Sequence, residues 1–270
     1  MSNSIPRLLR VPKIQMIFLL GLIYLSTLTK YPITQTLPIL ILALTFSSLS
    51  DLLFTYIRRR TFFIPYAAIV TALIITLIID PKAAWYQIAT ISTFAMVIKN
   101  FLRISQRHIF NPAASGLFIG GIIFNQYVSW WGVSFQTIRS FSPLNLLLFL
   151  ILLFPLFVSA IRLRRYVNIL SFLIFFPLLT QLINLNLSLP NLINSFLEPG
   201  ILFFALVMLP EPMTTPVNPK RQMLFGFGVA ILVTLLSLPL LNNFLLENRL
   251  LTDPLVLALL MTNLLFFRFR

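Results

Sequence analysis

The sequence contains no cysteine and a single histidine, His108. Iron–sulfur clusters need thiolate ligands, c-type haem is attached through cysteine, and bis-histidine haem needs two imidazoles. Zinc sites usually combine several cysteine or histidine side chains. None of these cofactors can therefore be held by this chain alone.

Charged side chains are also scarce, and most of them carry the same sign. They make up 10% of the residues, where ordinary soluble domains have about a quarter, and the chain has 20 basic residues against 6 acidic ones. Together with a mean hydropathy of +0.96, this composition predicts a polytopic membrane protein. The basic residues lie at the ends of apolar runs, which is typical of orientation in a bilayer and argues against nucleic acid as a partner.

The first segment has the basic-then-apolar profile of a signal sequence. Arg7, Arg10 and Lys13 precede an apolar run from Ile14 to Leu28. Because no small-x-small cleavage site follows that run, we expect a retained first span.

Apolar runs between polar or proline-rich breaks predict an all-α integral membrane protein with about ten transmembrane helices. The expected ranges are 11–29, 34–57, 62–79, 84–98, 112–128, 143–161, 166–185, 193–210, 222–242 and 253–267. Several are shorter than the roughly 20 residues that a perpendicular span needs. An eight-span arrangement would keep the charge asymmetry described next only if the two segments removed were adjacent, so ten spans are favoured.

Most basic residues fall on one side of this arrangement. That side has Arg7, Arg10, Lys13, Arg58, Arg59, Arg60, Lys99, Arg103, Arg107, Arg162, Arg164, Arg165, Lys220, Arg221, Arg268 and Arg270. The other side has Lys30, Lys82, Arg139 and Arg249. Since cytoplasmic loops collect positive charge, both termini are expected in the cytoplasm.

Two stretches of the chain resemble each other. TALIITLIIDP (71–81) and FALVMLPEP (204–212) each run from Ala-Leu into a carboxylate followed by proline. Pairing the third span with the eighth gives two inverted five-helix repeats, with Asp80 outside and Glu211 inside. The expected organisation is a first repeat at 1–130, an outer loop at 131–142 and a second repeat at 143–270. Chance similarity between two Leu/Ile-rich helices is the alternative.

The stretch RHIFNPAASG interrupts the apolar pattern after the fourth span. Asn111 is expected to cap the fifth helix with Pro112 at its first position, and Ser115 lies in the small-residue turn that follows. Arg107 and His108 precede this positive helix end, where they could hold a phosphate. The alternative is a capped helix whose basic neighbours touch lipid headgroups.

The stretch LPEPMTTPVNPKRQ forms a second interruption, after the eighth span. Its four prolines exclude a continuous helix and predict a rigid loop at the cytoplasmic face. Glu211, Thr214 and Thr215 offer a carboxylate and two hydroxyls to a ligand, while Gly226 and Gly228 give the next helix a small-residue face. The alternative is a stiff connector whose charges face water.

Two further features lie outside these stretches. Asp51 falls inside the second predicted span, where an ionisable group suggests an ion or proton path, although water or a nearby arginine could also solvate it. Trp130 and Trp131 are expected to form an interfacial aromatic anchor.

The segments Pro65 to Gly120 and Ala205 to Leu232 resemble the NqrB/RnfD family of flavin-bearing membrane subunits. That family serves the sodium-pumping NADH:quinone reductase and the Rnf ferredoxin:NAD oxidoreductase. The specific motifs are aromatic-Asn-Pro-Ala at Phe110 to Ala113 and Pro-Met-Thr-x-Pro at Pro212 to Pro216, preceded here by Pro-Glu-Pro where the family usually has Thr-Asp-Pro. The order of the motifs and the ten-helix inverted repeat agree as well.

The resemblance implies an inner-membrane electron-transfer subunit that passes electrons through a flavin, FMN or riboflavin, with possible coupling to Na⁺ or H⁺ movement. The family's attachment motif, Ser-Gly-Ala-Thr, is absent, because Thr137 follows Ser-Phe-Gln, so any flavin is expected to be bound non-covalently. Without a Rossmann fingerprint or P-loop, the chain needs a partner, an NAD(P)H- or ferredoxin-dependent flavoprotein reductase.

The resemblance also suggests roles for the candidate residues. Asn111 and Ser115 would orient the ligand, Arg107 and His108 would neutralise phosphate, and the side chains of Glu211, Thr214 and Thr215 would line the cytoplasmic half-site. The alternative function is a cofactor-free channel or secondary transporter for small solutes, because an inverted bundle with broken helices suits permeation equally well.

Overall fold

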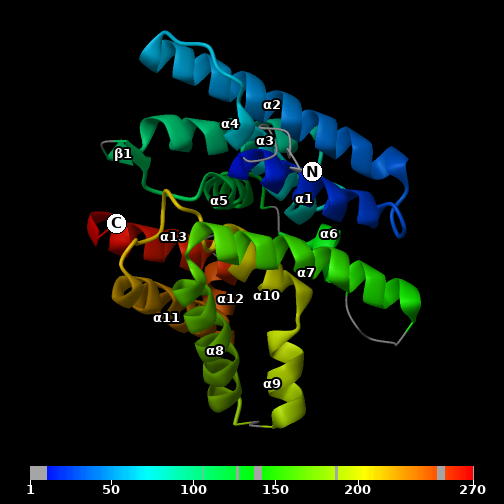
Figure 1. Cartoon of the computed structure of the whole chain (residues 1–270), viewed down its shortest axis with the longest axis vertical. Coiled ribbons are helices and arrows are strands. Elements are labelled where there is room, and N and C mark those ends of the chain that lie inside the picture. The colour runs from blue at the N-terminus through cyan, green and yellow to red at the C-terminus, as the bar shows by residue number, and fades with distance from the viewer. Residues whose placement is uncertain are drawn as a thin grey trace, which may run out of the picture.

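The computed structural model describes residues 11–104, 106–125, 128–136, 142–185, 188–247 and 253–269 (Figure 1). It is mainly helical, with one two-stranded hairpin. The longer helices are α1(Pro12–Thr27), α2(Ile33–Arg59), α3(Tyr66–Ile78), α4(Trp85–Phe101), α5(Pro112–Phe124), α7(Pro143–Leu163), α8(Tyr166–Ile183), α11(Pro219–Leu236) and α13(Pro254–Phe266). The shorter elements are β1(Arg103–Ile104), β2(Arg107–His108), α6(Trp131–Ser134), α9(Leu189–Phe196), α10(Pro199–Phe203), the π-helical turn η2(Phe204–Met208), α12(Pro239–Glu247) and the 3₁₀ turn η3(Phe267–Phe269).

Each of the ten predicted segments overlaps at least one of these helices. The predicted helix at 193–210 is interrupted, because α9 and the α10–η2 pair meet at a bend of 52°. Glu198 and Pro199 start a new helix at that bend, and the Glu198 carboxylate accepts a hydrogen bond from Ile201 N. The predicted helix at 222–242 is likewise divided by Pro239 into α11 and α12, since proline cannot supply the N–H that would continue α11.

A polar residue followed by proline starts many of these helices. Asn111, Ser142, Glu198, Asn218 and Asp253 each accept a hydrogen bond from a backbone N–H of the first turn, and the next residue is proline. The side-chain oxygen satisfies an N–H that has no partner in the helix, and proline lacks an N–H that would need one. The expected cap at Asn111 with Pro112 is therefore confirmed.

Four helices, α2, α7, α8 and α11, are long and apolar enough to cross a membrane. Helix α9 and the continuous α10–η2 segment make a fifth if the two are counted as one bent span. Four shorter helices are also apolar: α1, α3, α5 and α13 with its 3₁₀ extension. The long helices expose apolar side chains, such as Phe154, Phe157 and Ile161 of α7. Lipid is the natural solvent for such a surface.

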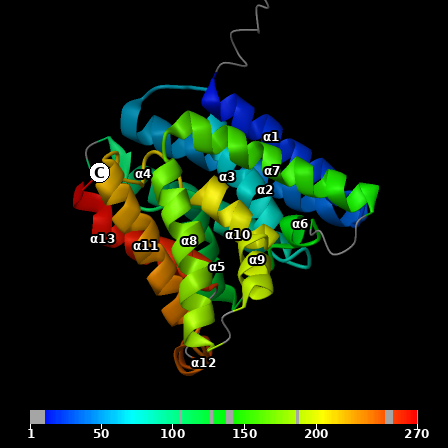
Figure 2. The same ribbon diagram turned by 60° about the horizontal axis from the view of Figure 1, so that its bottom comes forward.

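Helices pack in the same order in the two parts of the chain. In the first part, α3 packs against α1 and α2, α2 against α4, and α4 against α5. In the second part, η2 packs against α7 and α8, α8 against α11, and α11 against α13. The two parts meet where α1 lies beside α7 and α5 beside α13, and Figure 2 shows α8 and α11 running across the direction of α1 and α7.

Glycines allow close helix contacts in both parts. A Cβ on Gly116 of α5 would lie 2.6 Å from the carbonyl oxygen of Ile91 in α4, and a Cβ on Gly226 of α11 would lie 2.2 Å from that of Asn168 in α8. Gly228, which was expected to share this small-residue face, has nothing closer than 3.9 Å, so that part of the prediction is wrong. One turn of an α-helix spans 3.6 residues, so Gly226 and Gly228 point in different directions.

Candidate functional site

The two predicted polar interruptions meet in space. Imidazole Nε2 of His108, at the end of β2, lies 2.7 Å from carboxylate Oε1 of Glu211, although 103 residues separate them in sequence. Strand β2 is held against β1 with Arg103 opposite His108, which fixes the direction of the histidine. His108 is buried and the Glu211 side chain is mostly so, which makes this contact a partly desolvated polar pair.

The start of α5 lies against the end of η2. Asn111 Oδ1 accepts a hydrogen bond from Ala114 N, and Asn111 Nδ2 donates to the carbonyl oxygen of Met208 at 3.2 Å. Ser115 is buried, and its hydroxyl donates to the carbonyl oxygen of Pro112 at 2.9 Å. Both predicted ligand-orienting side chains thus have protein partners, and Asn111 joins the start of α5 to the end of η2.

The Pro-rich segment, residues 210–218, folds around Glu211. The second carboxylate oxygen of Glu211 accepts a hydrogen bond from the Thr214 hydroxyl at 3.2 Å, and the Thr215 hydroxyl donates to the Glu211 carbonyl oxygen at 2.8 Å. Both threonines are fully buried. The carboxylate is held between His108 and Thr214, so it does not simply face water as the connector interpretation expected.

The start of helix α8 contributes two side chains to this segment that the sequence did not point to, one from the residue just before the helix and one from its first turn. Arg165 Nη1 donates to the Pro216 carbonyl oxygen at 2.6 Å, and Asn168 Nδ2 donates to that of Leu209 at 3.3 Å. Burial lowers the pKa of the Arg165 guanidinium, and the positive charge of Arg107 lowers that pKa further. An Asn inside the apolar run of α8 was the available signal, since a polar group in a span needs a partner.

Several buried polar atoms around the Pro-rich segment have no hydrogen-bond partner among the described residues. They are Nη1 of Arg107, Nε of Arg165, Oδ1 of Asn168 and Oε1 of Gln222. Buried polar groups in native proteins are nearly always paired with protein, water or a ligand. These donors and acceptors are therefore the part of the site best suited to a bound polar molecule.

Asp51 is fully buried in α2 and pairs with α4. Its two carboxylate oxygens accept hydrogen bonds from Lys99 Nζ at 2.7 Å and from Asn100 Nδ2 at 2.9 Å. Asn100 Oδ1 in turn accepts hydrogen bonds from the Thr55 hydroxyl and, at 3.4 Å, from Arg58. The alternative, in which water or an arginine solvates Asp51, is wrong, because Lys99 and Asn100 occupy its oxygens.

The tryptophan pair does not form an interfacial anchor. Trp130 and Trp131 are both buried, and their indole N–H groups donate to Asp253 Oδ2 at 2.9 Å and to the Thr76 carbonyl oxygen at 2.8 Å. The prediction is wrong because α6 folds against α3. Trp85 and Tyr86, at the start of α4, are exposed aromatic side chains of the types that membrane interfaces favour.

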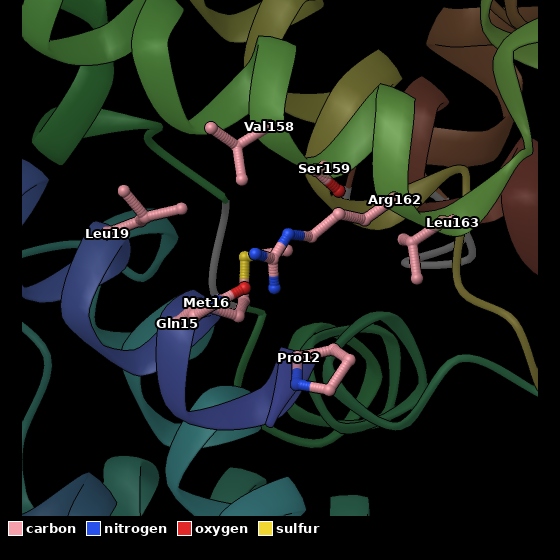
Figure 3. Close-up of a pocket in the computed structure, with 8 residues that line it drawn as sticks. All are labelled: Pro12, Gln15, Met16, Leu19, Val158, Ser159, Arg162 and Leu163. Atoms are coloured by element: carbon pink, nitrogen blue, oxygen red, sulfur yellow. The ribbon is translucent and has the colours of Figure 1, made fainter. Parts of the chain in front are cut away.

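A small pocket between α1 and α7 is separate from these residues. Figure 3 shows the Arg162 side chain reaching from α7 toward Met16 and Gln15 of α1, with Ser159 beside it. Its volume of about 30 Å³ is far below the roughly 300–1,000 Å³ of most ligand pockets. It contains none of the predicted site residues.

Some sequence predictions fall outside the described residues. Thr137, at the position compared with the flavin-attachment motif, lies outside them, as do Arg7, Arg10, Arg139, Arg249 and Arg270 of the charge pattern.

The apolar helices with lipid-compatible surfaces, together with polar groups buried at helix ends, define a multi-pass membrane protein. The particular family follows from its sequence. The model of the NQR2, RnfD, RnfE family matches residues 9–149, slightly more than half of the chain, and the chain belongs to that family. It is accordingly a membrane subunit of the Rnf/Nqr type of multi-subunit complex, with protein partners. No curated protein matched the sequence.

Proposed function

We propose that this chain is an electron-transfer subunit of an Rnf- or Nqr-like complex in the inner membrane, and that a non-covalently bound flavin carries the electrons. Family membership supports the proposal. The structural observation that carries it is the meeting of the α5 start with the Pro-rich segment through His108 and Glu211. A contact so distant in sequence, surrounded by buried polar atoms without partners, suits a bound polar cofactor.

The polar atoms available there match a flavin's chemistry. A flavin ring has an N–H that can donate a hydrogen bond, and the amide oxygens of Asn168 and Gln222 are buried acceptors without a partner in the described part of the chain. The Arg107 guanidinium would neutralise the phosphate of FMN, while Asn111, Ser115, Thr214 and Thr215 hold the backbone that shapes the site. His108 and Glu211 would fix the relative position of the two segments. When bound, the flavin supplies the electron-transfer chemistry.

We further propose ten spans in two inverted five-helix repeats with cytoplasmic termini. The recurring packing order of α1–α5 and of α7, α8, η2, α11 and α13 supports the repeat. The caps Asn111 and Asp253, at corresponding places before α5 and α13, support it as well.

Asp51, neutralised by Lys99, is the proposed point on an Na⁺ or H⁺ path. The proposed partner is an NAD(P)H- or ferredoxin-dependent flavoprotein reductase.

Substitution of Asn111 by leucine tests the cofactor site. We expect the Asn111→Leu protein to lose its bound flavin while its helix content stays unchanged, because the side chain that joins α5 to η2 is gone. Flavin content is measured by acid extraction and fluorescence, and helix content by circular dichroism.

The Asn111→Ser variant, which keeps a capping hydroxyl, is expected to lose flavin as well. Asn218→Ser, the same change at the exposed cap of α11, should retain it. Unchanged flavin content in both Asn111 variants would refute the proposed role.

A further inference from the structure

Two guanidinium groups lie around the Pro-rich segment without an acidic partner. The ion pairs among the described residues are Lys99–Asp51 and His108–Glu211, and neither involves Arg107 or Arg165. Both oxygens of Glu211 are already occupied by His108 and Thr214. The positive charges of these two arginines are therefore not neutralised by a carboxylate of the described chain.

Both arginines lie beside the Pro-rich segment. Arg107 immediately precedes His108, which contacts Glu211 at one end of the Pro-rich segment. Arg165 contacts the carbonyl oxygen of Pro216, near the other end. The two charges are close enough to interact, since the charge of Arg107 acts on Arg165. The two positively charged side chains therefore repel each other, and this repulsion destabilises their arrangement around the Pro-rich segment.

Both arginines also have unused donors. Arg165 is 8% exposed, and its Nε is buried without a hydrogen-bond partner within the described ranges, as is Nη1 of Arg107. A buried donor of a charged group that lacks a hydrogen-bond partner is unfavourable, because its lost hydration is not replaced. An anion between the two groups would satisfy the donors and offset the repulsion together.

We propose that Arg107 and Arg165 form a binding site for a phosphate group beside the Pro-rich segment. The guanidinium fork matches the oxygens of a phosphate, and two forks from different parts of the chain suit a tetrahedral group better than a planar carboxylate. The sequence suggested that Arg107 and His108 would hold a phosphate together. Arg165 takes the place of His108 in this proposal, because His108 already contacts Glu211. The site deepens the proposed function, in which Arg107 alone neutralises the phosphate of FMN, and it rests on that function only where the phosphate belongs to FMN.

A phosphate monoester in solution and the phosphodiester of a lipid headgroup share this chemistry. Basic sites among transmembrane helices commonly bind anionic headgroups. A monoester carries a charge of about −1.5 to −2, close to the combined charge of the two arginines, whereas a phosphodiester carries one negative charge.

The test uses the full chain in mild detergent and in lipid nanodiscs, with Arg107→Gln and Arg165→Gln as variants. Arg164→Gln is the matched control, because Arg164 is the exposed neighbour and its side chain makes no hydrogen bond in the described structure. The probes are inorganic phosphate against chloride at equal ionic strength, FMN against riboflavin, and phosphatidylglycerol against phosphatidylcholine. Binding is measured by thermal stabilisation and by native mass spectrometry.

We expect phosphate-bearing probes to bind the wild type and Arg164→Gln, and to bind each of the other variants about 10- to 100-fold more weakly, as expected for losing one charged hydrogen bond. Stabilisation by inorganic phosphate identifies a free monoester, and selective retention of phosphatidylglycerol identifies a lipid. If Arg165→Gln does not fold, the Arg107→Gln variant alone tests the site. It is expected to fold, because no hydrogen bond of the Arg107 side chain is described. Equal binding by all four proteins, or no binding by any, overturns the site. Phosphate binding in a protein that takes up no flavin would overturn the proposed function alone.

Discussion

Replacing Asp51 with asparagine is expected to destabilise the protein by about 3–5 kcal/mol. The substitution removes the carboxylate that neutralises Lys99 at 2.7 Å and leaves a largely buried ammonium group without a counter-charge. We expect the thermal unfolding midpoint in detergent to fall sharply, and scanning fluorimetry measures it directly.

The double variant Asp51→Asn with Lys99→Met separates the ion pair from other effects. Because both charges are then absent, we expect it to recover most of the lost stability. Asp80→Asn makes the same chemical change in the turn after α3, where the carboxylate accepts a hydrogen bond from Lys82 N at a partly exposed position. A midpoint for Asp51→Asn no lower than that of Asp80→Asn would contradict the importance of this pair.

Replacing Gly226 with alanine is expected to cost about 1–3 kcal/mol, and replacing it with leucine more. Even the alanine Cβ would meet the carbonyl oxygen of Asn168 at 2.2 Å, so α8 and α11 would have to separate. Asn168 also contacts Leu209, before the Pro-rich segment, so the separation should lower flavin content together with stability.

Gly228→Ala is the matched control for this contact. The same alanine at Gly228 would have no neighbour closer than 3.9 Å. We therefore expect its unfolding midpoint to equal or slightly exceed that of the wild type, because alanine favours helix. Similar midpoints for the two alanine variants would show that the α8–α11 contact is less close than described.

The helices could be predicted because their signals are local. Apolar runs and a polar residue followed by proline mark their positions, as Asn111–Pro112 and Asp253–Pro254 illustrate. Gly228 was misjudged because the sequence shows a pair of small residues but not which of them faces the neighbouring helix.

The partners of the site residues could not be predicted in the same way. The contact of His108 with Glu211 joins residues 103 positions apart, and nothing local in either motif specifies the other. For Asp51, solvation by water or an arginine was the alternative that the sequence suggested, because its distance from Arg58 is visible there. The approach of Lys99 depends instead on how α2 packs against α4. Trp130 and Trp131 were placed at the interface by residue type, yet the folding of α6 onto α3 buries them.

The absorbance spectrum of the purified protein, recorded before and after chemical reduction, tests the proposed electron-transfer role most directly. We predict a yellow protein with close to one flavin per chain, released by acid without a covalent remnant and bleached reversibly on reduction. A colourless protein that carries solute flux in liposomes would contradict the proposal and favour a channel or transporter.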